Sequence, residues 1–239
     1  MSWEVRTMRS GTSFFNSTLY RKTMLRFWPL WAAYGLMWLF LLPFNLLNNY
    51  FSMRGASVSS VELANRLVEY ARDIPNTLQF GVFVACGYGV LCAMAVFGYL
   101  YNNRSACMMH ALPMRRETLF VTQYLAGLSF LLLPVAAVAL CGVLVELALL
   151  PPSMWADALP CLAVWFLAHS GVCLFFFSFA AFCAMFTGHL LALSVFYGVL
   201  NCLAAIISAL MDSVLYLFLY GYNGLSGTTQ QAVAWLTPL

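Results

Sequence analysis

The residues of this chain that could carry chemistry are few and widely spaced. Its three histidines, His110, His169 and His189, do not cluster in the sequence. Cys107 and His110 form a C-x-x-H pair. Structural zinc takes four protein ligands and catalytic zinc takes three plus water, so two ligands do not predict a metal site. An enzyme that modifies lipids would need His, Asp or Arg gathered in one place. We therefore expect no catalytic residue and no bound metal.

Motifs for hydrolysis and for nucleotide binding are also missing. The sequence contains no H-E-x-x-H pair and no G-x-S-x-G turn. A phosphate-binding loop of the Walker A type needs glycines before a lysine. The single lysine, Lys22, lies in "LYRKTML" without any glycine. If ATP drives this protein, we expect ATP and Mg²⁺ to be bound by a partner subunit and no cofactor to be bound by this chain.

The positive charge of the chain is unusually placed. Only 8% of the residues are charged, yet three arginines fall within residues 102–118, and no Lys or Arg follows Arg116. The "RSACMMHA" stretch can form a short helix. Leu112 should interrupt it, because a residue before proline avoids helical backbone angles. Pro113 can then start the next helix. Met108, Met109 and Leu112 offer apolar contacts, whereas Arg104, His110, Arg115 and Arg116 offer charges to a partner or to lipid phosphates. The simpler alternative is that these arginines only anchor a cytoplasmic loop.

The elements around this loop are predicted to be membrane spans. Hydrophobic residues make up 63% of the chain, against about 45–50% in soluble domains. A helical span needs about 20 apolar residues. Five segments meet this criterion: 27–49, 78–101, 119–149, 158–187 and 190–211. We expect an all-α polytopic membrane protein in contact with the lipid bilayer. No basic stripe on a soluble domain suggests nucleic-acid binding.

Seven cysteines fall inside these apolar runs, where free thiols behave as small hydrophobic residues. The spans hold few ionisable groups, chiefly Glu146, Asp212 and His169. This shortage argues against a proton-coupled carrier, which would need buried carboxylates. We expect His169 to make an interhelical hydrogen bond, to Ser170 or to a backbone carbonyl.

Lys and Arg near the span ends set the orientation. The first 26 residues and the 102–118 loop are both basic, which places the N-terminus in the cytoplasm. The 50–76 loop then lies outside, although it also carries arginines. In that loop Ser59 and Glu62 have capping-box spacing. We expect a short external helix with Leu63, Leu67 and Tyr70 on one face, ended by Pro75.

The last segment, 213–239, is uncharged and is interrupted by glycines. We expect either short re-entrant helices or the approach to a sixth span that this sequence lacks. The second possibility raises the expectation that the sequence is truncated.

The 102–128 stretch, "NNRSACMMHALPMRRETLFVTQYLAGL", resembles the loop between the second and third spans of ABC-2 type transporter permeases. The similar group is that of Gram-positive antibiotic and peptide exporters. The matching residues are Arg104, Ser105, His110, Leu112, Pro113, Arg115, Arg116, Leu119, Phe120, Leu125, Gly127 and Leu128. Residues 14–31 resemble the elbow helix of this family, and 213–239 resemble its re-entrant helices before the last span.

The resemblance implies a type V exporter-like fold with an elbow helix at 13–26. It also implies that the 102–118 loop is a coupling helix, which docks on the ATPase subunit. The implied docking residues are Arg104, Met108, Met109, His110, Leu112, Pro113, Arg115, Arg116 and Glu117. The implied residues at the membrane interface are Arg21, Lys22 and Arg26.

By this resemblance the chain is expected to be the permease subunit of an ATP-driven transporter in a bacterial cell membrane. It would pair with a second permease protomer, identical or related, and with an ABC ATPase subunit. Its largely uncharged spans suit a hydrophobic or amphipathic cargo such as a drug, a peptide or a lipid. One alternative stays open, a membrane scaffold or sensor that transports nothing. A lipid-modifying enzyme is disfavoured, because the three histidines do not cluster in the sequence.

Overall fold

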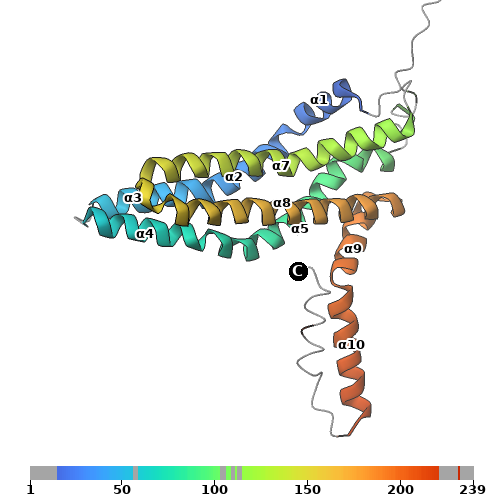
Figure 1. Ribbon diagram of the computed structural model, residues 1–239. Coiled ribbons are helices and arrows are strands. Elements are labelled where there is room, and N and C mark those ends of the chain that lie inside the picture. The colour runs from blue at the N-terminus through green and yellow to red at the C-terminus, as the bar shows by residue number, and fades with distance from the viewer. Residues whose placement is uncertain are drawn as a thin grey trace, which may run out of the picture.

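The computed structural model describes residues 15–55, 59–102, 106–108, 111, 115–220 and 231. These residues contain helices and turns but no strand, which confirms the all-α prediction. Four helical segments in this part of the chain are long and apolar enough to cross a membrane: Trp28–Gly55, Ser60–Tyr101, Arg116–Leu149 and Pro152–Phe186. They lie along one another as an antiparallel bundle (Figure 1).

The first two segments are each built from shorter helices. A first helix, α1 (Ser17–Arg26), precedes α2 (Trp28–Leu39), a π-helical turn (Phe40–Phe44) and α3 (Asn45–Gly55). The second segment contains α4 (Ser60–Asp73), a 3₁₀ turn (Ile74–Thr77), α5 (Leu78–Phe97) and a second 3₁₀ turn (Gly98–Tyr101). The π-helical turn contains Pro43, whose missing N–H and bulky ring disrupt the regular helical bonding.

The other two segments are nearly continuous helices, α7 (Arg116–Leu149) and α8 (Trp155–Phe186). The helix α8 packs against both α5 and α7 and forms the centre of the bundle. Gly89 of α5 allows a close approach, because a Cβ atom there would lie 3.3 Å from the backbone of Phe176 and Phe177. The main core gathers large buried side chains from α2, α5, α7 and α8, among them Trp38, Phe97, Phe130, Trp165 and Phe177.

A second apolar cluster lies at the end of the bundle where α3 meets α4. Its buried members are Leu46, Leu67, Val68, Ala71, Leu150 and Ala158. The helix expected in the 50–76 loop is α4, and the Ser59 hydroxyl accepts from the Glu62 N–H at 3.3 Å, as its spacing predicted. Tyr70 is 42% exposed, so its expected place on the same face as Leu67 does not bury it. Pro75 does not separate α4 from the following span either, because the 3₁₀ turn continues directly into α5.

The segment expected as a fifth span is divided in two. Helix α9 (Leu190–Asn201) and helix α10 (Leu203–Phe218) meet at Cys202 with a bend of 58°. The Asn201 side chain donates to the Tyr197 carbonyl at 2.9 Å, a bond of the kind that competes with regular helix bonding. Helix α10 leads away from the bundle (Figure 1). The re-entrant helices were expected over 213–239, but α10 continues to Phe218 instead of ending near 211. Most of 221–239 lies outside the described residues, so re-entrant helices there stay a prediction.

Candidate functional site

The basic end of the bundle is built by α1 lying against the first half of α7. Asn16 caps α1, because its side chain accepts from the Leu19 N–H at 3.0 Å. The Asn16 backbone N–H donates to the Thr122 hydroxyl at 3.1 Å, and the Tyr20 hydroxyl donates to Ser129 at 2.9 Å. One turn of α1 further on, the Thr23 hydroxyl donates to the Gln123 side chain at 3.4 Å. These bonds fix α1 to α7.

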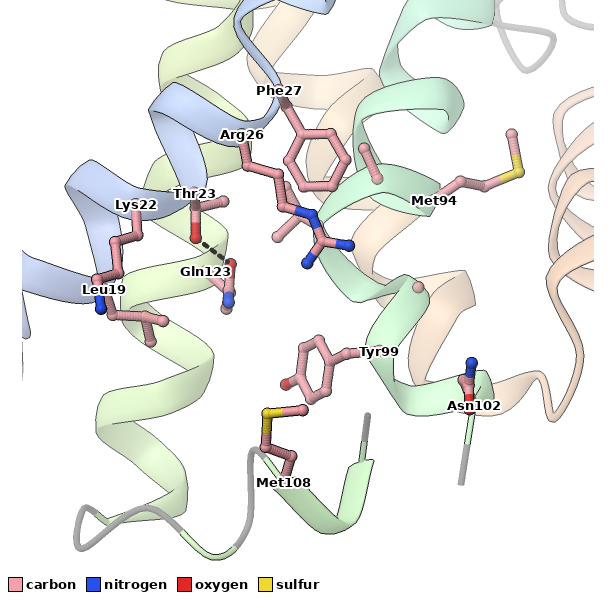
Figure 2. A pocket seen from close by; sticks show the side chains of 13 residues that line it. Leu19, Lys22, Thr23, Arg26, Phe27, Met94, Tyr99, Asn102, Met108 and Gln123 are labelled. Carbon is pink, nitrogen blue, oxygen red and sulfur yellow. Dashed lines mark hydrogen bonds between the residues drawn. The ribbon is translucent and has the colours of Figure 1, made fainter. Parts of the chain in front are cut away.

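A cavity of about 580 Å³ opens between α1, the end of α5 and α7 (Figure 2). This volume is within the range of small-molecule sites. Thirteen residues line it: Leu19, Lys22, Thr23, Arg26, Phe27, Met94, Ala95, Val96, Gly98, Tyr99, Asn102, Met108 and Gln123. No acidic side chain is among them. The cavity therefore combines positive charge with apolar walls.

The two cations of the cavity come from one face of α1. Lys22 and Arg26 are both exposed, and the Arg26 guanidinium lies 5.4 Å from the centre of the Phe27 ring. In the part of the chain that the structure describes, the ion pairs involve Glu62, Arg66, Arg72 and Asp157, at the opposite end of the bundle. Gln123 is only 2% exposed, and its amide nitrogen points away from Thr23 (Figure 2). The site is thus rich in donors for an anion.

The expected docking residues are placed in part. Met108 lines the cavity and is 72% exposed. Arg115, Arg116 and Glu117 are exposed at the start of α7. Five others lie outside the described residues: Arg104, Met109, His110, Leu112 and Pro113. Of the expected interface residues, Lys22 and Arg26 line the cavity, whereas Arg21 is exposed on α1 without lining it.

The start of α7 differs from the expectation that Pro113 begins this helix. Arg115 occupies the cap position with extended backbone angles, φ −68° and ψ 146°, and the helix begins at Arg116. A helix N-terminus carries partial positive charge, so arginines there do not stabilise the helix. Glu117 in the first turn is the residue that does.

A second polar group lies deep in the bundle. His169 of α8 is completely buried, and its Nε2 atom lies 2.8 Å from the Tyr34 hydroxyl of α2. The same hydroxyl lies 3.3 Å from the Cys173 sulfur. The Trp165 ring stacks on the imidazole with ring centres 5.1 Å apart. The expected interhelical hydrogen bond of His169 is therefore present, but its partner is Tyr34 rather than Ser170 or a backbone carbonyl.

The Tyr34–His169 pair joins α2 to α8 and suits a structural role. Among the described residues no group of three or more His, Cys, Asp or Glu could hold a metal ion. Glu146 is 1% exposed inside α7, apart from the basic cavity. Sequence reasoning missed Tyr34 and Gln123, because a single Tyr or Gln in an apolar run has no signature that names its partner. The polar cavity at the basic end is the stronger candidate for function.

Neither a protein-family model, nor a curated protein, nor a solved structure matches this chain. Its own features show a multi-helix protein, in which the described residues include four helical segments long and apolar enough to cross a membrane.

Proposed function

We propose that this chain is the transmembrane subunit of an ATP-driven transporter, a permease whose separate ATPase subunit docks on the 102–118 loop. The observation that supports this most is the set of exposed groups at the basic end of the bundle. Arg115 and Arg116 stand at the start of α7, and the exposed Met108 lies beside the cavity. Exposed methionine and arginine side chains are common in protein interfaces.

The position of this loop suits a mechanical coupling. The loop connects the end of α5 to the start of α7, and both helices pack on α8. A force on the loop therefore acts on two of the three helices at the centre of the bundle. Because packed helices shift as units, closure of a docked ATPase would be transmitted to the transmembrane path without any hydrolytic residue in this chain.

The exposed apolar surface supports the proposed second protomer, and the scarcity of charge supports the proposed cargo. Helices α9 and α10 expose many large apolar side chains, including Leu191, Val195, Leu210, Tyr216 and Leu217. A second permease protomer would cover part of this surface and complete a path between the two chains. The scarcity of charge in the long helices suits a hydrophobic or amphipathic compound, such as a drug, a peptide or a lipid, as the exported cargo.

Co-purification tests the proposal. The full-length chain, extracted from its cells in mild detergent, is compared with an Arg115→Glu/Arg116→Glu variant for a bound ATPase subunit and for ATPase activity. The matched control is Arg54→Glu/Arg66→Glu, which reverses two arginines at the opposite end of the bundle. We expect the ATPase with the wild type and the control, and its loss or uncoupling in the first variant.

The alternative function predicts another pattern. If the chain is a scaffold or sensor that transports nothing, no ATPase co-purifies with the wild type. The Arg115→Glu/Arg116→Glu variant then changes only insertion or orientation in the membrane. That result would remove the transporter proposal.

A further inference from the structure

We propose that the cavity between α1, α5 and α7 binds the phosphate headgroup of an anionic membrane lipid. Its ligand chemistry is that of a phosphate ester attached to an apolar chain. The inference does not depend on the docking of an ATPase, because it uses side chains of α1, α5 and α7 rather than the exposed start of α7.

The depth of the cavity matches the level of lipid headgroups. Helix α7 has 34 residues, which corresponds to about 51 Å at 1.5 Å per residue. The hydrocarbon layer of a bilayer is about 30 Å thick. The helix therefore extends roughly 10 Å beyond that layer at each end if it is centred. Gln123, about two turns into α7, then lies near the boundary between headgroups and acyl chains.

The polar side chains of the cavity are donors suited to a phosphate. Arg26 extends into the space between α1 and α5, and Lys22 lies one turn earlier on α1 (Figure 2). Gln123 of α7, which is 2% exposed as a residue, adds an amide nitrogen to the same cavity. The Gln123 oxygen already accepts from Thr23, which leaves the amide nitrogen to donate to a ligand. Arginine and lysine together with an amide donor can neutralise and orient a phosphate.

The remaining walls suit the apolar part of a lipid. Phe27, Met94, Ala95 and Val96 also line the cavity. A water-soluble phosphate compound gains nothing from these side chains, whereas the glycerol and the first methylene groups of a lipid lose contact with water there. The combination of two cations and an apolar wall is the reason to favour a lipid over a free phosphate.

A binding titration tests the charge requirement. The purified full-length chain in neutral detergent is titrated with phosphatidylglycerol and with phosphatidylcholine, and bound lipid is counted by native mass spectrometry. We expect preferential binding of phosphatidylglycerol and about fivefold weaker binding in Arg26→Gln, since a basic residue near anionic lipid contributes about 1 kcal/mol. Arg21→Gln removes the same charge from α1 outside the cavity and should bind as the wild type does.

A second pair of variants tests the place of binding without changing charge. Gly98 lines the cavity, whereas Gly87, in the same helical segment, does not. A Cβ atom would meet nothing within 4 Å at either position. Gly98→Phe should therefore fill the cavity and abolish preferential binding, whereas Gly87→Phe should not. Equal binding in both phenylalanine variants, or equal losses in Arg26→Gln and Arg21→Gln, would overturn the proposed site.

Competition with inorganic phosphate separates the two sources of the ligand. If excess inorganic phosphate leaves phosphatidylglycerol bound, the apolar part of the lipid contributes to binding, as proposed. If inorganic phosphate displaces the lipid and binds by itself, the cavity is a site for soluble phosphate compounds and the assignment to a lipid is wrong.

Discussion

At the scale of single residues, the buried imidazole of His169 shows how closely the long helices approach. It lies between Trp165, the Tyr34 hydroxyl and the backbone of α5 at Gly81. A polar group inside an apolar bundle is stable only if it finds a partner. The Tyr34 hydroxyl is this partner. The close fit around the ring leaves no room for a larger residue at Gly81.

Substitution of Gly81 by Ala tests this fit. A Cβ atom there would lie 2.9 Å from His169 Nδ1 and 3.3 Å from the Trp38 ring. We expect a loss of about 1–3 kcal/mol in the free energy of unfolding, which is typical of overpacking. Reversible unfolding in detergent measures it. Gly87→Ala is the control, since nothing lies within 4 Å of its Cβ position, and equal stability of the two variants would contradict this packing.

The sequence predicts that His169 makes a hydrogen bond but does not predict which residue is its partner. That His169 bonds across helices follows from the cost of an unpaired polar group in a membrane. Its partner Tyr34 could not be predicted, because the choice depends on how α2 and α8 are rotated about their axes. The same holds for Gln123, which looks like a chance polar residue in "VTQYLAGL" until α1 is placed beside it.

At the scale of helices, the local sequence predicts where a helix begins better than where a helix is interrupted. Ser59 and Glu62 predict the beginning of α4 correctly. The division of the 190–211 span at Cys202 was missed, because no proline or glycine lies at that residue; the Asn201 side chain donates to the Tyr197 carbonyl beside it. The π-helical turn at Pro43 was also missed, since a proline in an apolar run marks a disturbance of the helix but not its form.

Removal of the Ser59 cap tests the local account of α4. Ser59→Ala removes the side-chain acceptor of the Glu62 N–H, and loss of an N-cap costs about 1 kcal/mol. We expect faster hydrogen exchange at the amides of the first turn of α4, with little change in α5. Ser60→Ala keeps the cap and serves as the control. Unchanged exchange in Ser59→Ala would show that the packing of Leu67 and Ala71, not the cap, holds the start of the helix.

At the scale of the whole molecule, the bundle is asymmetric in charge. Among the described residues, the end formed by α1 and the start of α7 carries Arg21, Lys22, Arg26, Arg115 and Arg116 against one carboxylate, Glu117. The end formed by α3 and α4 mixes both signs, with the Arg72–Asp157 pair at 3.0 Å.

The composition predicts the membrane and the helical bundle, because both follow from apolar content and span length. The lateral order of the helices and the cavity could not be predicted, since they depend on long-range packing.

The native thiol of Cys107 tests the orientation. It is exposed, and it lies in the loop expected in the cytoplasm. A membrane-impermeant maleimide should label Cys107 in inside-out vesicles and not in intact cells. A cysteine introduced at Glu62 of α4, with Cys107 replaced by Ser, should give the opposite result. Labelling of both positions from the same side would contradict the bundle topology.

The central claim is that the basic end of the bundle binds an ATPase subunit, and photo-cross-linking tests it most directly. A photoreactive amino acid replaces Arg115 in the full-length chain, expressed in its own cells, and the adducts are identified by mass spectrometry. Arg66, at the opposite end, receives the same substitution as the control. The account predicts an adduct with an ATP-binding protein that carries a glycine-rich phosphate loop, at position 115 and not at 66. Adducts at position 115 with lipid alone, or with another copy of this chain alone, would contradict it.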